Sequence, residues 1–154
     1  MGLALVTKNQ RIRTKSFMDF VAALWSGRQS GGDLSPNSDT TKFDIAACKA
    51  MVDGIYVAAN ASTAVVLTGL TPTAVTSSAQ YQKVLVTLKQ AGTYGVYTGA
   101  KAASQALALL PEVPAGEVYI AHLELPVSFT AGSTAIDTAY CKQADAPAAV
   151  LGQF

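Results

Sequence analysis

Seven short runs of β-branched and aromatic residues follow one another from about residue 40 onward, separated by glycine, proline, asparagine, serine and threonine. Runs of this length between turn-forming residues predict β-strands. Their close spacing favours a mainly β fold, either a β-sandwich or a small barrel. The runs are "KFDIAA", "GIYVAA", "TAVVLTG", "YQKVLVTL", "YGVYTG", "EVYIAHLELPV" and "STAIDTA".

Two turns of this β domain are specified by their residues. "VTLKQAGTYGVYTG" predicts a hairpin in which Gly92 takes a positive φ. Asp53 followed by Gly54 in "VDGI" is a turn signature. In the first strand of the hairpin, "KVLVTL" is apolar on nearly both faces, as we expect of a sheet with one face buried by symmetry mates in a trimer.

The segment "AKAASQALALL", residues 100–110, is the exception among these strands. Its alanine, glutamine and leucine content favours a short helix. Pro111 bars Leu110 from the α region, so this helix is expected to end there. A Pro-Glu-Val-Pro-Ala-Gly connection then leads into the strand that carries His122.

The first 39 residues have a different character from the rest. Ser16, Asp19 and Gly27 are suited to cap a helix at about residues 17–26. An apolar stripe at helical spacing runs along it, and such a stripe has to be buried, either on its own domain or on a neighbouring subunit. The stripe consists of Phe17, Phe20, Val21, Leu24 and Trp25.

The same end of the chain is basic. Residues 1–32 contain five basic residues against Asp19 alone, a net charge of +4, whereas the remainder has six basic and nine acidic residues, a net charge of −3. This arm is either a solvated tail or a segment that docks on an acidic neighbour. "SGRQSGGDLSPNSDTT" predicts a linker after it. The expected organisation is a basic arm with helix and linker at 1–39 and a β-rich domain at 40–154.

Few residues offer catalytic chemistry. His122 is the single histidine, and period two in "EVYIAHLEL" places it on one face with Val118, Ile120 and Glu124. We expect a hydrogen-bonded surface or interface histidine there, although a catalytic base and an ion site near a symmetry axis are alternatives. Nothing in the spacing of the carboxylates indicates that they converge on a catalytic centre. Those considered are Asp44, Asp53, Glu112, Glu117 and Asp137.

Several function classes lack their sequence signatures. No phosphate-binding GxxxxGK[ST] or GxGxxG loop is present, and "TKNQRIRTK" is basic without interleaved aromatic residues. Cys48 and Cys141 are far apart and, with one histidine, indicate free buried thiols and no structural metal or cofactor. "MGLALVTKNQ" lacks the features of a signal peptide and "SFMDFVAALWSG" is too short to span a bilayer, which indicates synthesis in a reducing cytoplasm and no membrane partner.

A wider pattern resembles a known group of proteins. "TTKFDIAACKAMVDGIYV", then "YQKVLVTLKQAGTYGVYTGAKAASQALALLPEVPAGEVYIAHLEL", then "SFTAGSTAID" resemble β-rich structural proteins of tailed bacteriophage virions. The shared pattern is an "F-D-I-A-A" strand with a following "D-G" turn, a hairpin, a small-residue segment, "LP-x-xP-x-G" and "F-T-A-G-x-T". It covers about residues 40–140 and contains no catalytic signature.

The resemblance implies a virion component without enzymatic activity, assembled in the host cytoplasm and frequently trimeric. Because the chain is short and carries a basic arm, we expect a capsid decoration or minor capsid protein bound to the major capsid protein or another virion protein. A tail-fibre or baseplate component is the alternative. No specific nucleic acid is expected as a partner.

The arm and the tyrosines supply the candidate contact residues. Only 14% of residues are charged, well below the roughly 25% of a typical soluble domain, which fits a surface partly covered by partners. The expected partner-interface residues are Arg11, Arg13, Lys15, Phe17, Phe20, Leu24 and Trp25. A carbohydrate-binding sandwich is a further alternative, for which Tyr94, Tyr97 and Tyr119 would have to face solvent instead of packing in the sheets.

Overall fold

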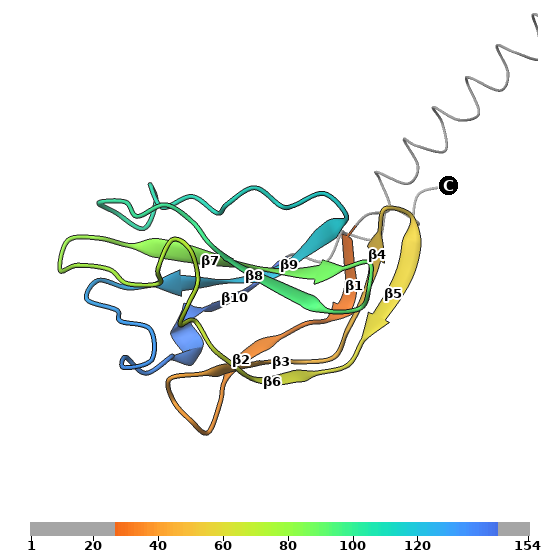
Figure 1. Cartoon of the computed structure of the whole chain (residues 1–154), viewed down its shortest axis with the longest axis horizontal. Helices are drawn as coiled ribbons and strands as arrows, with labels where there is room; N and C mark the ends of the chain where they lie inside the picture. The colour runs from red at the N-terminus through yellow and green to blue at the C-terminus, as the bar shows by residue number, and fades with distance from the viewer. Residues whose placement is uncertain (1–26, 145–154) are drawn as a thin grey trace, which may run out of the picture.

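The computed structural model describes residues 27–144, which are mainly β (Figure 1). Ten strands and one 3-10 turn occur in this range, and it contains no α-helix. The strands are β1 (Gly27–Gly31), β2 (Leu34–Pro36), β3 (Phe43–Ile45), β4 (Cys48–Val52), β5 (Ile55–Ala59), β6 (Ser62–Val65), β7 (Gln82–Lys89), β8 (Tyr94–Thr98), β9 (Glu117–Leu125) and β10 (Cys141–Gln143). The 3-10 turn η1 covers Thr138–Tyr140.

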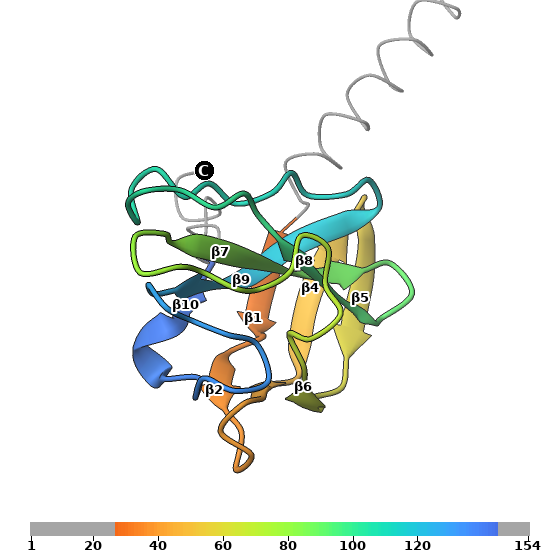
Figure 2. The same cartoon turned by 60° about the vertical axis from the view of Figure 1, so that its left-hand side comes forward.

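These strands form three antiparallel sheets, as Figures 1 and 2 show from two sides. Their strand orders are β1-β4-β5, β2-β3-β6 and β10-β9-β7-β8. Over the described residues the sheets remain open and do not close into a barrel. The mainly β expectation is confirmed, whereas the predicted helix at 17–26 lies outside the described residues.

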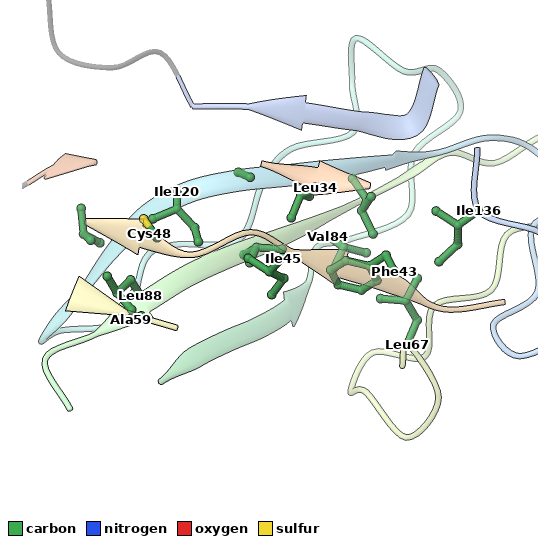
Figure 3. Close-up of a cluster of buried hydrophobic side chains, with 14 of the residues drawn as sticks. Leu34, Phe43, Ile45, Cys48, Ala59, Leu67, Val84, Leu88, Ile120 and Ile136 are labelled. Carbon is green, nitrogen blue, oxygen red and sulfur yellow. The ribbon is translucent and has the colours of Figure 1, made fainter. Parts of the chain in front are cut away.

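The core lies where the two smaller sheets face the four-stranded sheet (Figure 3). Phe43 and Ile45 of β3 pack there with Val84 of β7 and Ile120 of β9, and each is almost completely buried. Leu67 and Ile136 come from connecting segments to close one end of this cluster. Loops as well as strands therefore contribute apolar side chains to one contiguous core.

Both predicted turns are present. β7 and β8 form the expected hairpin, with Gly92 at φ 76° between them. β4 and β5 are joined by the two-residue turn Asp53-Gly54, in which both residues have positive φ, 49° and 77°. This conformation matches the twist of the adjoining strands, which explains the aspartate-glycine pair.

The two faces of β9 differ from the sequence prediction at one point. Val86 pairs with Ala121 but the next residue, Thr87, pairs with Tyr119, so Ile120 is an extra residue in the ladder. Such a bulge reverses the side-chain alternation beyond it. His122 therefore shares its face with Tyr119 and Glu124. Val118 and Ile120, predicted to share that face, point into the core instead.

The predicted helix at residues 100–110 is wrong. The segment forms an isolated bridge between Ala102 and Tyr81 and then a single turn, in which the amides of Leu107 and Ala108 donate to Ser104 O. Leu107 and Leu109 are exposed, whereas Ala108 is buried. A short helix gains little from propensity alone, and here the pairing with Tyr81 decides the conformation.

Two other predicted segments need correction. "STAIDTA" is not a strand, because the Asp137 side chain accepts the Ala139 amide and starts η1, while Ile136 anchors the segment in the core. The predicted linker at 26–41 contains β1 and β2, and Leu34 belongs to the core. Strands and core residues are therefore present in part of the predicted linker. The sequence prediction also missed the strands β4 and β10.

Both faces of β7 are covered, but the second face, for which the sequence predicted a cover of symmetry mates, is covered by a segment of the same chain. Leu85 is buried on the face turned away from the core. In both views the segment 99–116 runs along that face of the four-stranded sheet (Figures 1 and 2). Its start is held by Gly99, whose carbonyl accepts a hydrogen bond from Gln82 Nε2 at 2.9 Å. Burial on both faces of β7 therefore requires no neighbouring subunit.

Over residues 27–144, no helix has the length and apolar character needed to span a membrane.

Candidate functional site

The candidate site is the outer face, which we define as the side of the β10-β9-β7-β8 sheet turned away from the core. Its side chains are brought together by the register of three neighbouring strands, β9, β7 and β8. Thr87 of β7 lies between Gly95 of β8 and Tyr119 of β9, and Lys89 lies beside Glu117. Polar residues that are far apart in the chain, such as Thr87 and Glu117 at a separation of 30 positions, therefore meet on one surface.

Glu117 is the centre of the first group on this face. Its Oε2 accepts a short hydrogen bond from Thr87 Oγ1, and its Oε1 accepts one from Tyr97 OH at 2.7 Å. Lys89 Nζ lies 3.8 Å from Oε1. Gly95 leaves the space that the carboxylate fills, since a Cβ there would lie 2.8 Å from Oε2 and 2.5 Å from Thr87 Oγ1.

The pKa of Tyr97 reflects this contact. Its hydroxyl donates to the Glu117 carboxylate, and this hydrogen bond, together with burial and the nearby negative charge, raises the pKa of Tyr97 to about 12. Tyr97 therefore stays protonated near neutral pH and acts as a donor.

His122 is the centre of the second group. Its Nδ1 lies 2.6 Å from Tyr119 OH, and its Nε2 lies 3.6 Å from Glu124 Oε1. Lys83 Nζ is 3.3 Å from the same Glu124 oxygen. Lys142 of β10 is the cross-strand partner of His122. The histidine is thus enclosed by side chains of its own sheet.

The protonation of His122 is set by competing effects. Burial lowers the pKa of His122, and the charges of Lys83 and Lys142 act in the same direction, while Glu124 opposes them. Burial is the largest single effect on the pKa of Glu124 and acts to raise it, but the hydrogen bonds and charges of Lys83 and His122 together outweigh burial, so the net pKa is lowered. His122 is therefore neutral at pH 7, held between a tyrosine and a carboxylate.

This arrangement predicts a pH dependence of stability. The unfolded chain protonates His122 near its ordinary pKa of about 6.5, whereas the folded chain does so only at lower pH, so folding becomes less favourable as pH falls below about 6.5. Replacing His122 by glutamine should flatten the free energy of unfolding between pH 5 and 7, measured by urea denaturation. Asp39 and Glu124 also affect the pH dependence of stability. Because the pKa values of both carboxyl groups are lowered, we expect their effect on the free energy of unfolding below pH 5. An unchanged slope in the variant would contradict the assignment.

Of the other carboxylates considered from sequence, Glu112 is exposed, and Asp44, Asp53 and Asp137 have separate local roles. Asp44 Oδ1 accepts from Asn37 Nδ2 at 2.6 Å and from the Ala64 amide at 2.8 Å. Asp53 is in the β4–β5 turn, and Asp137 caps η1. Within residues 27–144, no three histidine, cysteine or acidic side chains gather closely enough to hold a metal ion.

The tyrosines do not form an exposed aromatic platform. Tyr94 packs against the core, and its hydroxyl donates to Ala46 O at 3.1 Å. Tyr97 and Tyr119 have their hydroxyls at Glu117 and His122. All three are partly buried, which favours the sheet-packing role over the carbohydrate-binding alternative.

The prediction that Cys48 and Cys141 are free buried thiols is confirmed in part. Both are free, and Cys48 is buried as expected, but Cys141 is only half-buried. Burial raises the pKa of both thiols, which makes the reactive thiolate scarce at neutral pH.

The seven interface residues predicted in the arm lie outside the described residues. Sequence reasoning missed the outer-face network, because the approach of Thr87, Tyr97 and Glu117 depends on strand register. The alternation in "YGVYTG" and "EVYIAHLEL" was the available signal, but it does not identify the partner strands. Comparison with family models, curated proteins and solved structures gives no significant match.

Proposed function

We propose that this chain is a structural component of a bacteriophage virion, in which it decorates the capsid as a homotrimer bound to the major capsid protein or another virion protein. In this role it performs no catalysis. The resemblance of residues 40–140 to β-rich phage structural proteins motivates the assignment. A tail or baseplate position is the alternative. We interpret the three facing sheets as a β-sandwich.

The observation that carries the proposal is the self-contained polar network of the outer face. Glu117 and His122, the groups best suited to acid-base chemistry there, are bonded to Thr87, Tyr97 and Tyr119 of the same sheet. Bonds of this kind fix the strands of the sheet to one another. A rigid body of this type is suited to display or reinforcement of a shell.

Attachment is assigned to the N-terminal arm. β1 is the first strand of the described residues, and Arg28 in it is bonded to the rest of the domain, since its Nη1 donates to Gly31 O at 2.8 Å and its Nη2 to Ala144 O at 2.5 Å. Burial of Phe17, Phe20, Leu24 and Trp25 in the contact would contribute about 1.5–3 kcal/mol each before ordering costs. Exposed charge pairs of Arg11, Arg13 and Lys15 would add at most about 1 kcal/mol each and weaken with salt.

Deletion of residues 1–26 is expected to leave a folded body that no longer attaches to particles. The cut must stop before Gly27, because a longer deletion would remove β1 from its sheet. Far-UV circular dichroism checks the fold, and sedimentation with particles lacking this protein measures attachment. Separate head and tail preparations distinguish the two virion positions.

Two point variants sharpen this test. Trp25→Ala should reduce binding at least tenfold, whereas replacing Arg11, Arg13 and Lys15 by glutamine should mainly reduce the salt dependence of binding. Attachment of the truncated protein at wild-type occupancy would overturn the role of the arm.

A further inference from the structure

β5 is an edge strand whose outer side is unpaired within residues 27–144. It pairs with β4 alone, and the two-residue turn Asp53-Gly54 makes Val52 and Ile55 the first hydrogen-bonded pair. Because hydrogen-bonded and non-bonded pairs alternate, the backbone N–H and C=O groups of Tyr56 and Ala58 point away from β4. These outward backbone groups form no hydrogen bond with the backbone of another described residue.

The other five sheet edges carry features that discourage pairing, whereas β5 carries none. β1 has a bulge between Arg28 and Ser30, β2 is three residues long and ends at Pro36, and β10 is three residues long with a central lysine. β6 is interrupted by the positive φ of Ala64, and the end of β8 is tied to Pro72 O through the Thr98 hydroxyl. β5 reads "IYVAA", with no charge, proline or bulge.

The exposed side chains of β5 are apolar. Ile55 is 51% and Tyr56 is 54% exposed, while Val57 and Ala59 are buried against the core. Ala58 is exposed beside Tyr56. Such an uncharged edge favours an apolar strand as its partner over a charged ligand.

The sequence of β5 is complementary to itself when two copies run antiparallel. With Val57 facing Val57 of a second copy, Tyr56 stands opposite Ala58, and Ile55 stands opposite Ala59. Each large exposed side chain thus meets a small one on the same face of the sheet. In the same register the outward backbone groups of Tyr56 and Ala58 form hydrogen-bonded pairs.

We infer that two copies of this chain pair through their β5 strands, antiparallel about a two-fold axis at Val57, to form one continuous sheet of six strands. The interface is isologous, so each copy contributes the same surface. It is separate from the arm, and from any contact that gathers three copies into a trimer. Where such a trimer exists, β5 pairing joins two trimers.

The β7–β8 turn approaches this edge and limits how a second copy can dock. A Cβ at Gly92 would lie 3.9 Å from both Ala58 O and Val57 Cγ1, so the turn lies next to the strand near its buried face. The side of β5 that carries the Tyr56 and Ala58 side chains remains exposed. The second copy must therefore add its strand in the plane of the sheet.

Tyr56→Lys tests the pairing directly in the full chain. Sedimentation velocity of the purified protein should show the wild type associating in pairs, and the variant should weaken that association at least tenfold, because the lysine would face Ala58 of the other copy. Leu109→Lys is the matched control, since it adds the same charge at another exposed apolar site and should leave association unchanged. A wild type that stays unpaired at about 100 μM, or equal effects of both variants, would overturn the inference.

Cysteine crosslinking tests the register. In a Cys141→Ser background, mixing a Tyr56→Cys chain with an Ala58→Cys chain should give a mixed disulfide, because Cα atoms of a hydrogen-bonded pair are about 5.5 Å apart. Replacing Ala58→Cys by Asn60→Cys in the mixture should abolish the mixed product. Equal crosslinking in both mixtures would contradict the two-fold at Val57. These measurements need no particles, so their failure is distinct from failure of attachment through the arm.

Discussion

Phe43→Ala should lower the free energy of unfolding by about 3–5 kcal/mol, the usual range for removing a fully buried phenylalanine. Phe43 has no exposed surface, and it packs near Val84, Leu67 and Ile136 where strands and connecting segments meet (Figure 3). These neighbours belong to separate parts of the chain and cannot all collapse into the space left behind. Since a domain is stabilised by about 5–15 kcal/mol in total, the variant should be close to unfolding.

Urea denaturation followed by circular dichroism measures this effect. Phe43→Leu is the matched control, because it keeps a branched apolar side chain and should cost well under half as much. Val127→Ala, at a partly exposed position, should change the free energy of unfolding by less than about 0.5 kcal/mol. Equal effects of Phe43→Ala and Val127→Ala would contradict the position of Phe43 in the core.

The hairpin strands β7 and β8 of the larger sheet were predictable because their information is local. "YQKVLVTL" and "YGVYTG" combine β-branched and aromatic residues with a glycine that suits the hairpin, and β7 and β8 form there. Alternation and turn chemistry act over two to four residues. Sequence alone is sufficient for elements of this kind.

Elements that depend on distant partners were missed. β1 and β2 lie in a segment rich in glycine and serine, and their strand conformation comes from pairing with β4 and β3. The bulge at Ile120 also depends on β7, and it moved His122 to the opposite face from Val118. A one-residue shift of this kind leaves no signal in the pattern of β9 itself.

The outer-face network was unpredictable for the same reason. Glu117 and Tyr97 are 20 residues apart, and their contact requires β8 and β9 to flank β7 in one register. The apolar pattern on both faces of β7 was interpreted as burial of one face by symmetry mates, but the pattern carries no information on whether that cover is a neighbouring subunit or the segment 99–116. Only the path of residues 99–116 in the structure distinguishes a cover from the same chain from a cover by a neighbouring subunit.

Gly99→Ala should displace that cover and destabilise the body by about 2–4 kcal/mol, from steric strain and from exposure of Leu85. A Cβ at Gly99 would lie 2.4 Å from Leu109 O and 3.2 Å from Lys83 O. Both are backbone atoms, so no side-chain rotation relieves the contact and the segment itself must move. The buried bond from Gln82 Nε2 to Gly99 O would then be strained or lost, leaving Gln82 without a partner.

Trypsin cleavage after Lys101 reports this displacement, because the bond becomes accessible when residues 99–116 leave the outer face. We expect Gly99→Ala to be cleaved there many times faster than the wild type under native conditions, together with faster amide exchange around Leu85. Leu109→Ala is the control, since that side chain is 71% exposed and its loss leaves the path of the segment intact. If Gly99→Ala and Leu109→Ala were cleaved at the same rate, the close approach at Gly99 could not be what holds the cover on β7.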